Sequence, residues 1–380
     1  MSDFDRPVDR RSTHSLKWDK YRTQDILPLW VADTDFMASP AIIEALHQRI
    51  EHGVFGYTLV SKELVDTVQT RLQKRYQWPI QPDWLVWMPG MVSGLNIACR
   101  ATGHSGSAVL SPKPVYPPFM SAPTLSERQS TTIPMVLQGT RWVMDLDALE
   151  EAITPACKLL LFCNPHNPGG TCYRKEELQR LLEICERHDL ILCSDEIHCD
   201  LILDPEIQHI PVASLDSKLA KRTITLMAPS KTYNIAGLAC AFAIIPDASL
   251  RNHFRRVMQG IVPEVNLLGL TAALAAYRDS EQWSMQQLDY LRGNRDYLIE
   301  EINRIPGMHL HPFEATYLAW IDISGLELTD PGGFFEHAGV GLSPGADFGD
   351  SKFMRLNFGC PRATLEEAVS RIRQALAQRG

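Results

Sequence analysis

The chain has 380 residues, more than a single hydrophobic core usually fills, so one large and one smaller domain are expected. Its formal net charge is −8, from 37 Lys and Arg against 45 Asp and Glu, and it has no run rich in Lys or Arg. This balance argues against nucleic acid and against an anionic membrane surface as partners. The composition is compatible with a small-molecule ligand.

The nine cysteines are an odd number and include no C-x-x-C pair. They lie in apolar runs such as 159–163, which is typical of buried thiols in a reducing compartment. The opening residues, MSDFDRPVDRR, carry charges where a signal peptide needs an apolar core, and the longest apolar run, 235–245, is too short to span a bilayer. We therefore predict a cytoplasmic protein with structural cysteines, and assign no metal site.

The first expected helix has Ser39 as its N-cap and Pro40 at its first position, and ends before Gly53. From about residue 85 to 245, short apolar runs alternate with helix-like segments. The expected strands are 85–88, 108–110, 159–163, 190–193, 223–227 and 240–245. This alternation predicts an α/β fold, with a mostly parallel sheet flanked by helices on both faces.

The pattern changes from about residue 281, where a long helix is followed by a hairpin-like segment, ATYLAWIDI, and a closing helix from about Leu365. We expect these elements to form a smaller α+β domain together with the N-terminal arm. The predicted boundaries assign residues 46–280 to the large domain, and residues 1–45 with 281–380 to the small one.

Polar turns follow four of the expected strands. Ligands of open α/β sheets bind outside the carboxyl ends of the strands, so these turns hold the candidate functional residues. The turns are PGMVSG after 85–88, NPHNPGG after 159–163, SDEIH after 190–193 and APSK after 223–227. They bring a glycine turn that opens a helix, an asparagine, an acid with a histidine, and a lysine to one edge of the sheet.

This combination suits pyridoxal 5'-phosphate. A helix N-terminus suits the phosphate, a lysine can form a Schiff base, a carboxylate can keep the pyridine nitrogen protonated, and an asparagine can hold the phenolate. Each element alone is weak, because a lysine after a strand is more often a solvated charge and an acid before a helix is often a cap. The ordered combination carries the prediction.

The chain also resembles the fold type I pyridoxal-phosphate enzymes of the aminotransferase class I/II superfamily, and within them the cystathionine β-lyase (C–S lyase) group of MalY/PatB type. The resemblance runs along nearly the whole chain. It is carried by HSLKWDKY (14–21), LPLWVADTDF (27–36), HGVFGYT (52–58), PVYPPF (114–119), CNPHNPGG (163–170), SDEIHCDL (194–201), APSKTYNIAGL (228–238), ATYLAW (315–320) and RLNFGCPR (355–362). It implies an aspartate-aminotransferase-like fold with a seven-stranded sheet, and a homodimer with shared active sites.

By this resemblance Lys231 carries the cofactor's Schiff base, Asp195 pairs with the pyridine nitrogen, and Asn167 donates to the phenolic oxygen. Tyr116 stacks on the ring. Tyr57 reaches across the dimer interface to the phosphate of the neighbouring site. Lys231 and Tyr57, together with the histidine of SDEIH, are the expected catalytic residues.

The turn that contains Met91 and Val92 is expected to give backbone donors to the phosphate, with Ser230 as a further ligand. Ala228 and Ala239 stand where aminotransferases carry a serine and an arginine that contact the phosphate. The phosphate must therefore depend more on the helix N-terminus, on Ser230 and on the tyrosine of the partner subunit.

Arg355 matches the arginine that binds the substrate α-carboxylate, a bidentate task that lysine performs less well. Trp30 and Tyr317 are the expected contacts of the distal half of the substrate, although aromatic residues in these runs are equally typical of a core. Gly169 stands in place of the commoner threonine, and we expect this change to affect the turn and not the chemistry.

His198 lies three residues after Asp195, where many aminotransferases carry a tyrosine that donates to the cofactor phenolate. A histidine can also donate, and with an unperturbed pKa of about 6.5 it could titrate in the working range. We predict that His198 binds the cofactor and tunes its Schiff base; the alternative is a packed structural histidine.

The resulting prediction is a carbon–sulfur β-lyase that takes a cysteine thioether, L-cystathionine or a related S-conjugate, to a thiol, pyruvate and ammonia. With L-cystathionine the thiol is homocysteine. In this scheme the amine of Lys231 takes the Cα proton. Two alternatives remain: an aminotransferase, which shares the fold and the cofactor, and a non-catalytic regulatory protein that keeps both.

Overall fold

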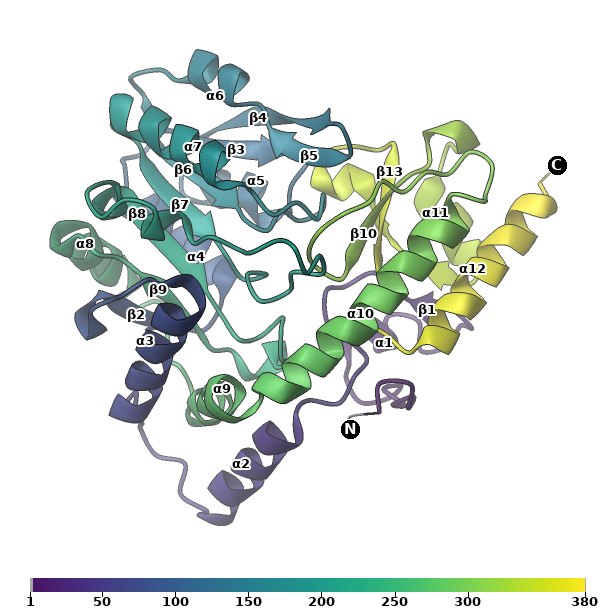
Figure 1. The fold of residues 1–380 in the computed structure, drawn as a ribbon, viewed down its shortest axis with the longest axis horizontal. Helices are drawn as coiled ribbons and strands as arrows, with labels where there is room; N and C mark the ends of the chain where they lie inside the picture. The colour runs from purple at the N-terminus through teal and green to yellow at the C-terminus, as the bar shows by residue number, and fades with distance from the viewer. Residues whose placement is uncertain (1–2, 380) are drawn as a thin grey trace.

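The computed structural model describes residues 3–379 and is built around a mixed sheet of eight strands (Figure 1). The strand order is β2-β9-β8-β7-β6-β3-β4-β5. The strands are β2 (Leu85–Met88), β3 (Ala108–Lys113), β4 (Gln129–Gln138), β5 (Arg141–Met144), β6 (Cys157–Cys163), β7 (Ile191–Asp195), β8 (Thr223–Met227) and β9 (Ala241–Ile244).

The centre of this sheet is parallel, as predicted. Strands β4, β3, β6, β7 and β8 pair parallel in that order, whereas β9 runs antiparallel to both β8 and β2. The eighth strand, β5, pairs only with β4 in an antiparallel hairpin and adds to the seven that the resemblance implied. The α/β class with a mostly parallel sheet is confirmed.

Helices cover both faces of the sheet, because its strands are apolar on both sides. One core joins the sheet to α4, α5 and α8, and a second joins it to α6 and α7. The helices of this part are α3 (Lys62–Tyr76), α4 (Met91–Ala101), α5 (Pro118–Leu125), α6 (Leu146–Ala152), α7 (Lys175–Arg187), α8 (Ala248–Met258) and α9 (Leu267–Asp279).

The N-terminal arm around β1 lies beside the C-terminal part of the chain, on the right of Figure 1, whereas α2 packs against α9 at the lower left. Strand β1 pairs parallel with β11, and β10, β13 and β12 form a small antiparallel sheet. The elements are α1 (Leu16–Asp19), β1 (Leu27–Pro28), α2 (Pro40–Glu51), α10 (Glu281–Ile302), β10 (Leu318–Asp322), α11 (Pro331–His337), β11 (Val340–Gly341), β12 (Ser343–Pro344), β13 (Phe353–Asn357) and α12 (Arg362–Ala377). The expected hairpin at 315–323 is wrong, since β10 pairs with the distant β13.

The division into two domains stays a prediction. One hydrophobic core combines residues of the N-terminal arm with α10, β10, β13 and α12, and it continues into the proposed large domain through Leu201, Tyr233 and Ala272. The proposed boundary between residues 45 and 46 falls inside α2, which begins at Pro40 as expected. Within residues 3–379 no helix is long and apolar enough to cross a membrane.

Candidate active site

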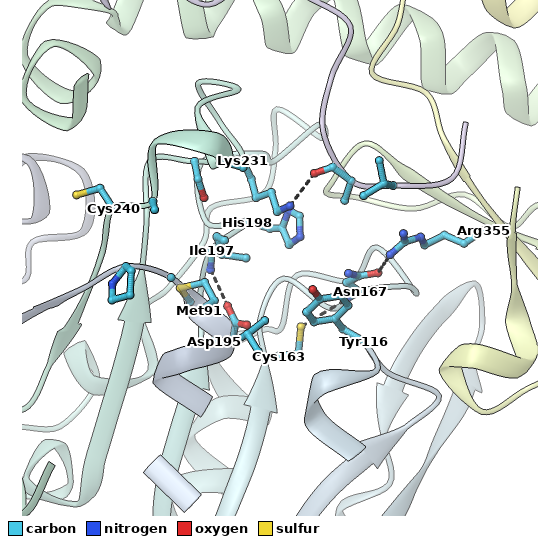
Figure 2. Close-up of a pocket in the computed structure, with 18 residues that line it drawn as sticks. Met91, Tyr116, Cys163, Asn167, Asp195, Ile197, His198, Lys231, Cys240 and Arg355 are labelled. Atoms are coloured by element: carbon cyan, nitrogen blue, oxygen red, sulfur yellow. Dashed lines mark hydrogen bonds between the residues drawn. The ribbon is translucent and has the colours of Figure 1, made fainter. Parts of the chain in front are cut away.

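A cavity of about 220 Å³ lies at the carboxyl ends of β6, β7 and β8. Figure 2 shows Asp195 at the strand ends, Lys231 and His198 beside each other, and Arg355 reaching in from the small C-terminal sheet. The walls are formed by Val31, Ala32, Pro89, Gly90, Met91, Val92, Tyr116, Cys163, Asn167, Asp195, Ile197, His198, Ser230, Lys231, Ala236, Ala239, Cys240 and Arg355. Most of the residues proposed from separate sequence motifs therefore share one cavity.

Lys231 follows β8 after a short turn and projects its amine into the cavity. Its Nζ donates to the backbone carbonyl of Ala32 at 2.6 Å. Burial, with a smaller effect of the nearby Arg355, lowers the pKa of Lys231 to about 8. A buried lysine with a lowered pKa presents a far larger fraction of neutral amine near neutrality than an ordinary lysine does, as a nucleophile or a base requires.

Asp195 is the last residue of β7, and its side chain is 4% exposed. Its Oδ1 accepts a hydrogen bond from the backbone N–H of Ile197 at 3.1 Å. Burial raises the pKa of Asp195 to about 7, although Lys231 acts in the opposite direction. Among residues 3–379 no cation lies within ion-pair distance of this carboxylate, so no salt bridge compensates its charge.

Asn167 and Tyr116 lie on adjoining backbone segments of the cavity wall. The backbone N–H of Tyr116 donates to the carbonyl of Asn167 at 3.1 Å. Oδ1 of Asn167 accepts from Nη1 of Arg355 at 3.1 Å, which leaves the Nδ2 amide free to donate to an acceptor in the cavity. The asparagine is therefore oriented by the arginine.

Arg355 lies on β13 and is held from three sides. Besides the bond to Asn167, its Nη2 donates to the carbonyl of Trp30 at 2.8 Å, and its guanidinium lies 4.5 Å from the centre of the Phe348 ring. Nε has no hydrogen-bond partner. Burial lowers the pKa of Arg355 to about 10, so the side chain stays charged at neutral pH. Such a buried, partly unsatisfied guanidinium suits an anionic ligand.

His198 lines the cavity beside Lys231, and its ring packs edge-on against Tyr317 with 6.2 Å between the ring centres. Burial, with smaller effects of Lys231 and Arg355, lowers the pKa of His198 to about 3. The prediction that it could titrate in the working range is therefore wrong, because both cations and the loss of water disfavour its charged form. Its Nδ1 has no hydrogen-bond partner, so a tuning role by a neutral imidazole stays a prediction.

Helix α4 points its N-terminus at the cavity. Its N-cap, Gly90, has no capping side chain, so the N–H groups of the first turn are available to an anion. Met91 and Val92 from this turn line the cavity together with Ser230. Ala239 also lines it, and so contributes a methyl group where aminotransferases have an arginine.

Comparison with known proteins identifies the family. The model for aminotransferase class I and II matches residues 24–372. The chain belongs to this family. It is 36% identical to the cystathionine beta-lyase PatB of Bacillus subtilis (strain 168), over 98% of this chain and 100% of that protein. This places it with the C–S lyases of MalY/PatB type, as predicted.

Solved structures agree with the family. The crystal structure of OvoB has a TM-score of 0.96 and 52% sequence identity, and covers 98% of this chain and 99% of that chain. Cystalysin from Treponema denticola, whose crystal structure contains a pyridoxal 5'-phosphate cofactor, has a TM-score of 0.96 and 32% identity over 100% of both chains. The aspartate-aminotransferase type of fold and the cofactor are thereby confirmed.

Pyridoxal 5'-phosphate fits the groups of this cavity. Lys231 offers an amine of lowered pKa, Asp195 a carboxylate without an ion pair, and Asn167 a free amide. The N-terminus of α4 offers backbone donors for a phosphate group. These four groups thus each have a matching part of the cofactor.

Three predicted site residues do not line the cavity. Tyr317 is fully buried behind the wall, and its hydroxyl donates to the carbonyl of Ala32 at 3.0 Å. The indole of Trp30 donates to the carbonyl of Lys17 at 3.1 Å, so this residue acts at the site only through its own carbonyl. Tyr57 is 113% exposed, on a segment without helix or strand.

Several wall residues were not predicted from the sequence. Val31 and Ala32 come from the N-terminal arm, and the carbonyl of Ala32 accepts from Lys231. Cys163 and Cys240 also line the cavity, whereas we had predicted only core roles for the cysteines. All nine cysteines are buried and free, as expected. A signal for Ala32 was available, since WVAD lies within one of the motifs that resemble the family.

Proposed function

We propose that this protein is a pyridoxal-phosphate-dependent carbon–sulfur β-lyase, which cleaves L-cystathionine or a related cysteine S-conjugate to a thiol, pyruvate and ammonia. With L-cystathionine the thiol is homocysteine. The observation that carries the proposal is that one cavity holds both the amine of Lys231 and the guanidinium of Arg355. A similar protein, PatB, is named a cystathionine beta-lyase.

Arg355 binds the α-carboxylate of the substrate. Its guanidinium is fixed by Asn167, by the carbonyl of Trp30 and by the Phe348 ring, and still has an N–H without a partner. A fixed guanidinium offers two parallel donors to a carboxylate, which sets the orientation of the Cα–H bond. The amine of Lys231, which lines the same cavity, is the base that faces this bond.

When bound, pyridoxal phosphate withdraws electrons from the Cα of the amino acid, which is chemistry that protein side chains do not supply. Asp195 serves this function by holding a proton on the ring nitrogen, because an uncompensated carboxylate favours a positive partner. The Nζ of Lys231 takes the Cα proton, and the carbonyl of Ala32 accepts from the resulting ammonium. The electrons left at Cα form a Cα–Cβ double bond as the Cβ–S bond breaks, and the leaving thiolate takes up a proton. Water then hydrolyses the remaining three-carbon unit to pyruvate and ammonia.

We also propose a homodimer in which Tyr57 completes the phosphate site of the partner subunit. The segment around it exposes four large apolar or aromatic side chains, a patch that suits a protein interface. They are Val54, Phe55, Tyr57 and Leu59. A protein that sediments as a monomer at micromolar concentration while retaining its cofactor would contradict this proposal.

The alternative with a specific observation behind it is an aminotransferase, because the matching family model is named for that activity. The two functions share the cavity and differ in whether the amino group is transferred or released as ammonia. The holoenzyme should be mixed with S-benzylcysteine or L-cystathionine and assayed for pyruvate and thiol, and in parallel with 2-oxo acids for amino transfer. Amino transfer that exceeds pyruvate release would favour the alternative.

A panel of cysteine S-conjugates that differ only in the group on sulfur would identify the substrate class. We expect Arg355→Lys to raise KM for every member by a similar factor, since all share the α-carboxylate. A protein that keeps the visible absorbance band of bound cofactor after dialysis, but neither releases thiol from any member nor transfers an amino group, would instead favour a non-catalytic role.

A further inference from the structure

His166 lies in the middle of the NPHNPGG turn that follows β6, and is 1% exposed. Its side chain is not part of the cavity wall. The backbone around it is tightly closed, since its N–H donates to the carbonyl of Thr171 and its carbonyl accepts from Gly170, both at 2.8 Å. A buried polar ring at this place needs a reason, because burial of polar groups costs free energy unless they are hydrogen-bonded.

Both ring nitrogens of His166 are hydrogen-bonded. The backbone N–H of Gly169 donates to Nδ1 at 3.1 Å, so the ring proton lies on Nε2. Nε2 then donates to the carbonyl of Pro114 at 3.1 Å. Burial lowers the pKa of His166 to about 4, which keeps this tautomer neutral at working pH.

The two partners of the ring belong to the two segments that carry Asn167 and Tyr116. Gly169 is on the turn with Asn167, and Pro114 is two residues before Tyr116. The segments are otherwise joined by one backbone bond, from the N–H of Tyr116 to the carbonyl of Asn167. His166 supplies the side-chain link between them.

We propose that His166 is a positioning residue, whose imidazole holds the turn carrying Asn167 against the segment carrying Tyr116 and so sets both side chains for the cofactor. This inference rests on the proposed roles of those two residues. It extends them to a side chain that touches neither cofactor nor substrate.

The glycine at position 169 supports the inference. A Cβ at Gly169 would lie 2.8 Å from Nδ1 of His166 and 2.7 Å from Cβ of Trp142. The absence of a side chain therefore lets the backbone N–H approach the imidazole. This gives a physical reason for glycine where the family more often has threonine.

The test is the affinity of the apoprotein for pyridoxal 5'-phosphate, measured by titration of the visible absorbance. His166→Ala removes both ring bonds and so lets Asn167 move. We expect Kd to rise about tenfold, the factor that corresponds to the loss of one buried hydrogen bond from Asn167 to the cofactor. His166→Asn keeps an acceptor for Gly169, and His166→Gln keeps a donor for Pro114, so each should restore part of the affinity. His253→Ala, an exposed histidine on α8, is the matched control and should leave Kd unchanged.

A double-mutant cycle separates positioning from general damage. In an Asn167→Ala background, His166→Ala should raise Kd by a smaller factor than in the wild type, because one of the two groups that it positions is already gone. An equal loss in both backgrounds, or a wild-type Kd in His166→Ala, would overturn the proposal. If His166→Ala does not fold, the same double-mutant cycle is measured with His166→Asn and His166→Gln. Cofactor affinity does not depend on the reaction catalysed, so a failure here is distinct from a failure of the proposed lyase activity.

Discussion

Asp195 and Asp200 are five residues apart, are buried to the same degree at 4% and 5% exposure, and have opposite surroundings. Asp200 lies against α3, where its Oδ2 is 2.8 Å from Nη2 of Arg71 and its Oδ1 is 3.5 Å from Nη2 of Arg75. Burial raises its pKa, but the two arginines outweigh burial and lower the pKa to about 2. Asp195 has no such partner, and its pKa is raised to about 7.

The comparison distinguishes Asp200, whose carboxylate stabilises the fold, from Asp195, whose carboxylate is available to a ligand. A charge that the protein compensates belongs to the structure, whereas a buried charge without a partner is a free-energy cost that a bound cation can offset. Asp195 faces the cavity and Asp200 does not line it. The same run of residues, SDEIHCD, thus contains a ligand-binding carboxylate, Asp195, and a structural one, Asp200.

The largest effect is expected at the lysine that shares the cavity with Asp195. Lys231→Ala removes both the attachment point of the cofactor and the proposed base, and should lower pyruvate release by at least about a thousandfold. Borohydride reduction followed by peptide mass spectrometry should find the cofactor on Lys231 in the wild type alone. Near-normal pyruvate release by Lys231→Ala would refute the assignment.

Asp195→Asn keeps the shape of the side chain but cannot carry a charge. We expect turnover to fall by about a thousandfold, because an amide does not favour a protonated ring nitrogen. The stability of the apoprotein should change in the opposite direction to the turnover. Since the folded pKa of Asp195 is raised, its carboxyl costs wild-type stability as pH rises from about 4 through about 7, and the variant should lack this loss.

Denaturant unfolding of both apoproteins at pH 5 and pH 8 measures this difference. The stability of Asp195→Asn relative to wild type should increase at the higher pH. A constant difference between the two pH values would mean that the carboxylate is compensated after all.

Asp200→Asn should show the reverse pattern. Leaving the largely buried guanidinium of Arg71 beside a neutral amide should destabilise the fold by about 3 kcal/mol, while the Kd for pyridoxal phosphate stays near the wild-type value. Thermal unfolding together with cofactor titration measures both quantities. A large loss of cofactor affinity with unchanged stability would erase the distinction between the two aspartates.

The smallest effect is a pH dependence. Because burial lowers the pKa of Lys231 to about 8, the rate at which the apoprotein attaches pyridoxal phosphate should rise with pH up to that value and level off above it. Below pH 8 the rate should change about tenfold per pH unit, following the neutral amine. Stopped-flow absorbance measures the rate, and a midpoint near 10.5 would show an unperturbed lysine.

Local sequence was sufficient for much of this picture. The apolar run at 85–88 is a strand as predicted, and Lys231, Asp195 and Asn167 follow strands whose carboxyl ends meet at one edge. The hairpin of β4 and β5 was not predicted, since β4 opens with the polar residues 129–132 and only two of its ten residues are buried. The parallel pairing of β4 with β3, which its own sequence does not show, places it in the sheet.

The remaining failures also depend on distant contacts. Nothing near His198 in the sequence reveals that it is fully buried near Lys231 and Arg355; burial, with smaller effects of these two cations, lowers its pKa to about 3. The indole of Trp30 is turned away by a bond to the carbonyl of Lys17, which a motif cannot show. Residue type predicted the groups present in the cavity, and tertiary packing set their charge and direction.

The most direct measurement follows thiol, pyruvate and ammonia together, with purified holoenzyme, S-benzylcysteine and no added 2-oxo acid. The account predicts equal amounts of the three products over many turnovers, and no turnover in Lys231→Ala. Thiol release that stops after one equivalent per site, or that requires a 2-oxo acid, would contradict a β-lyase.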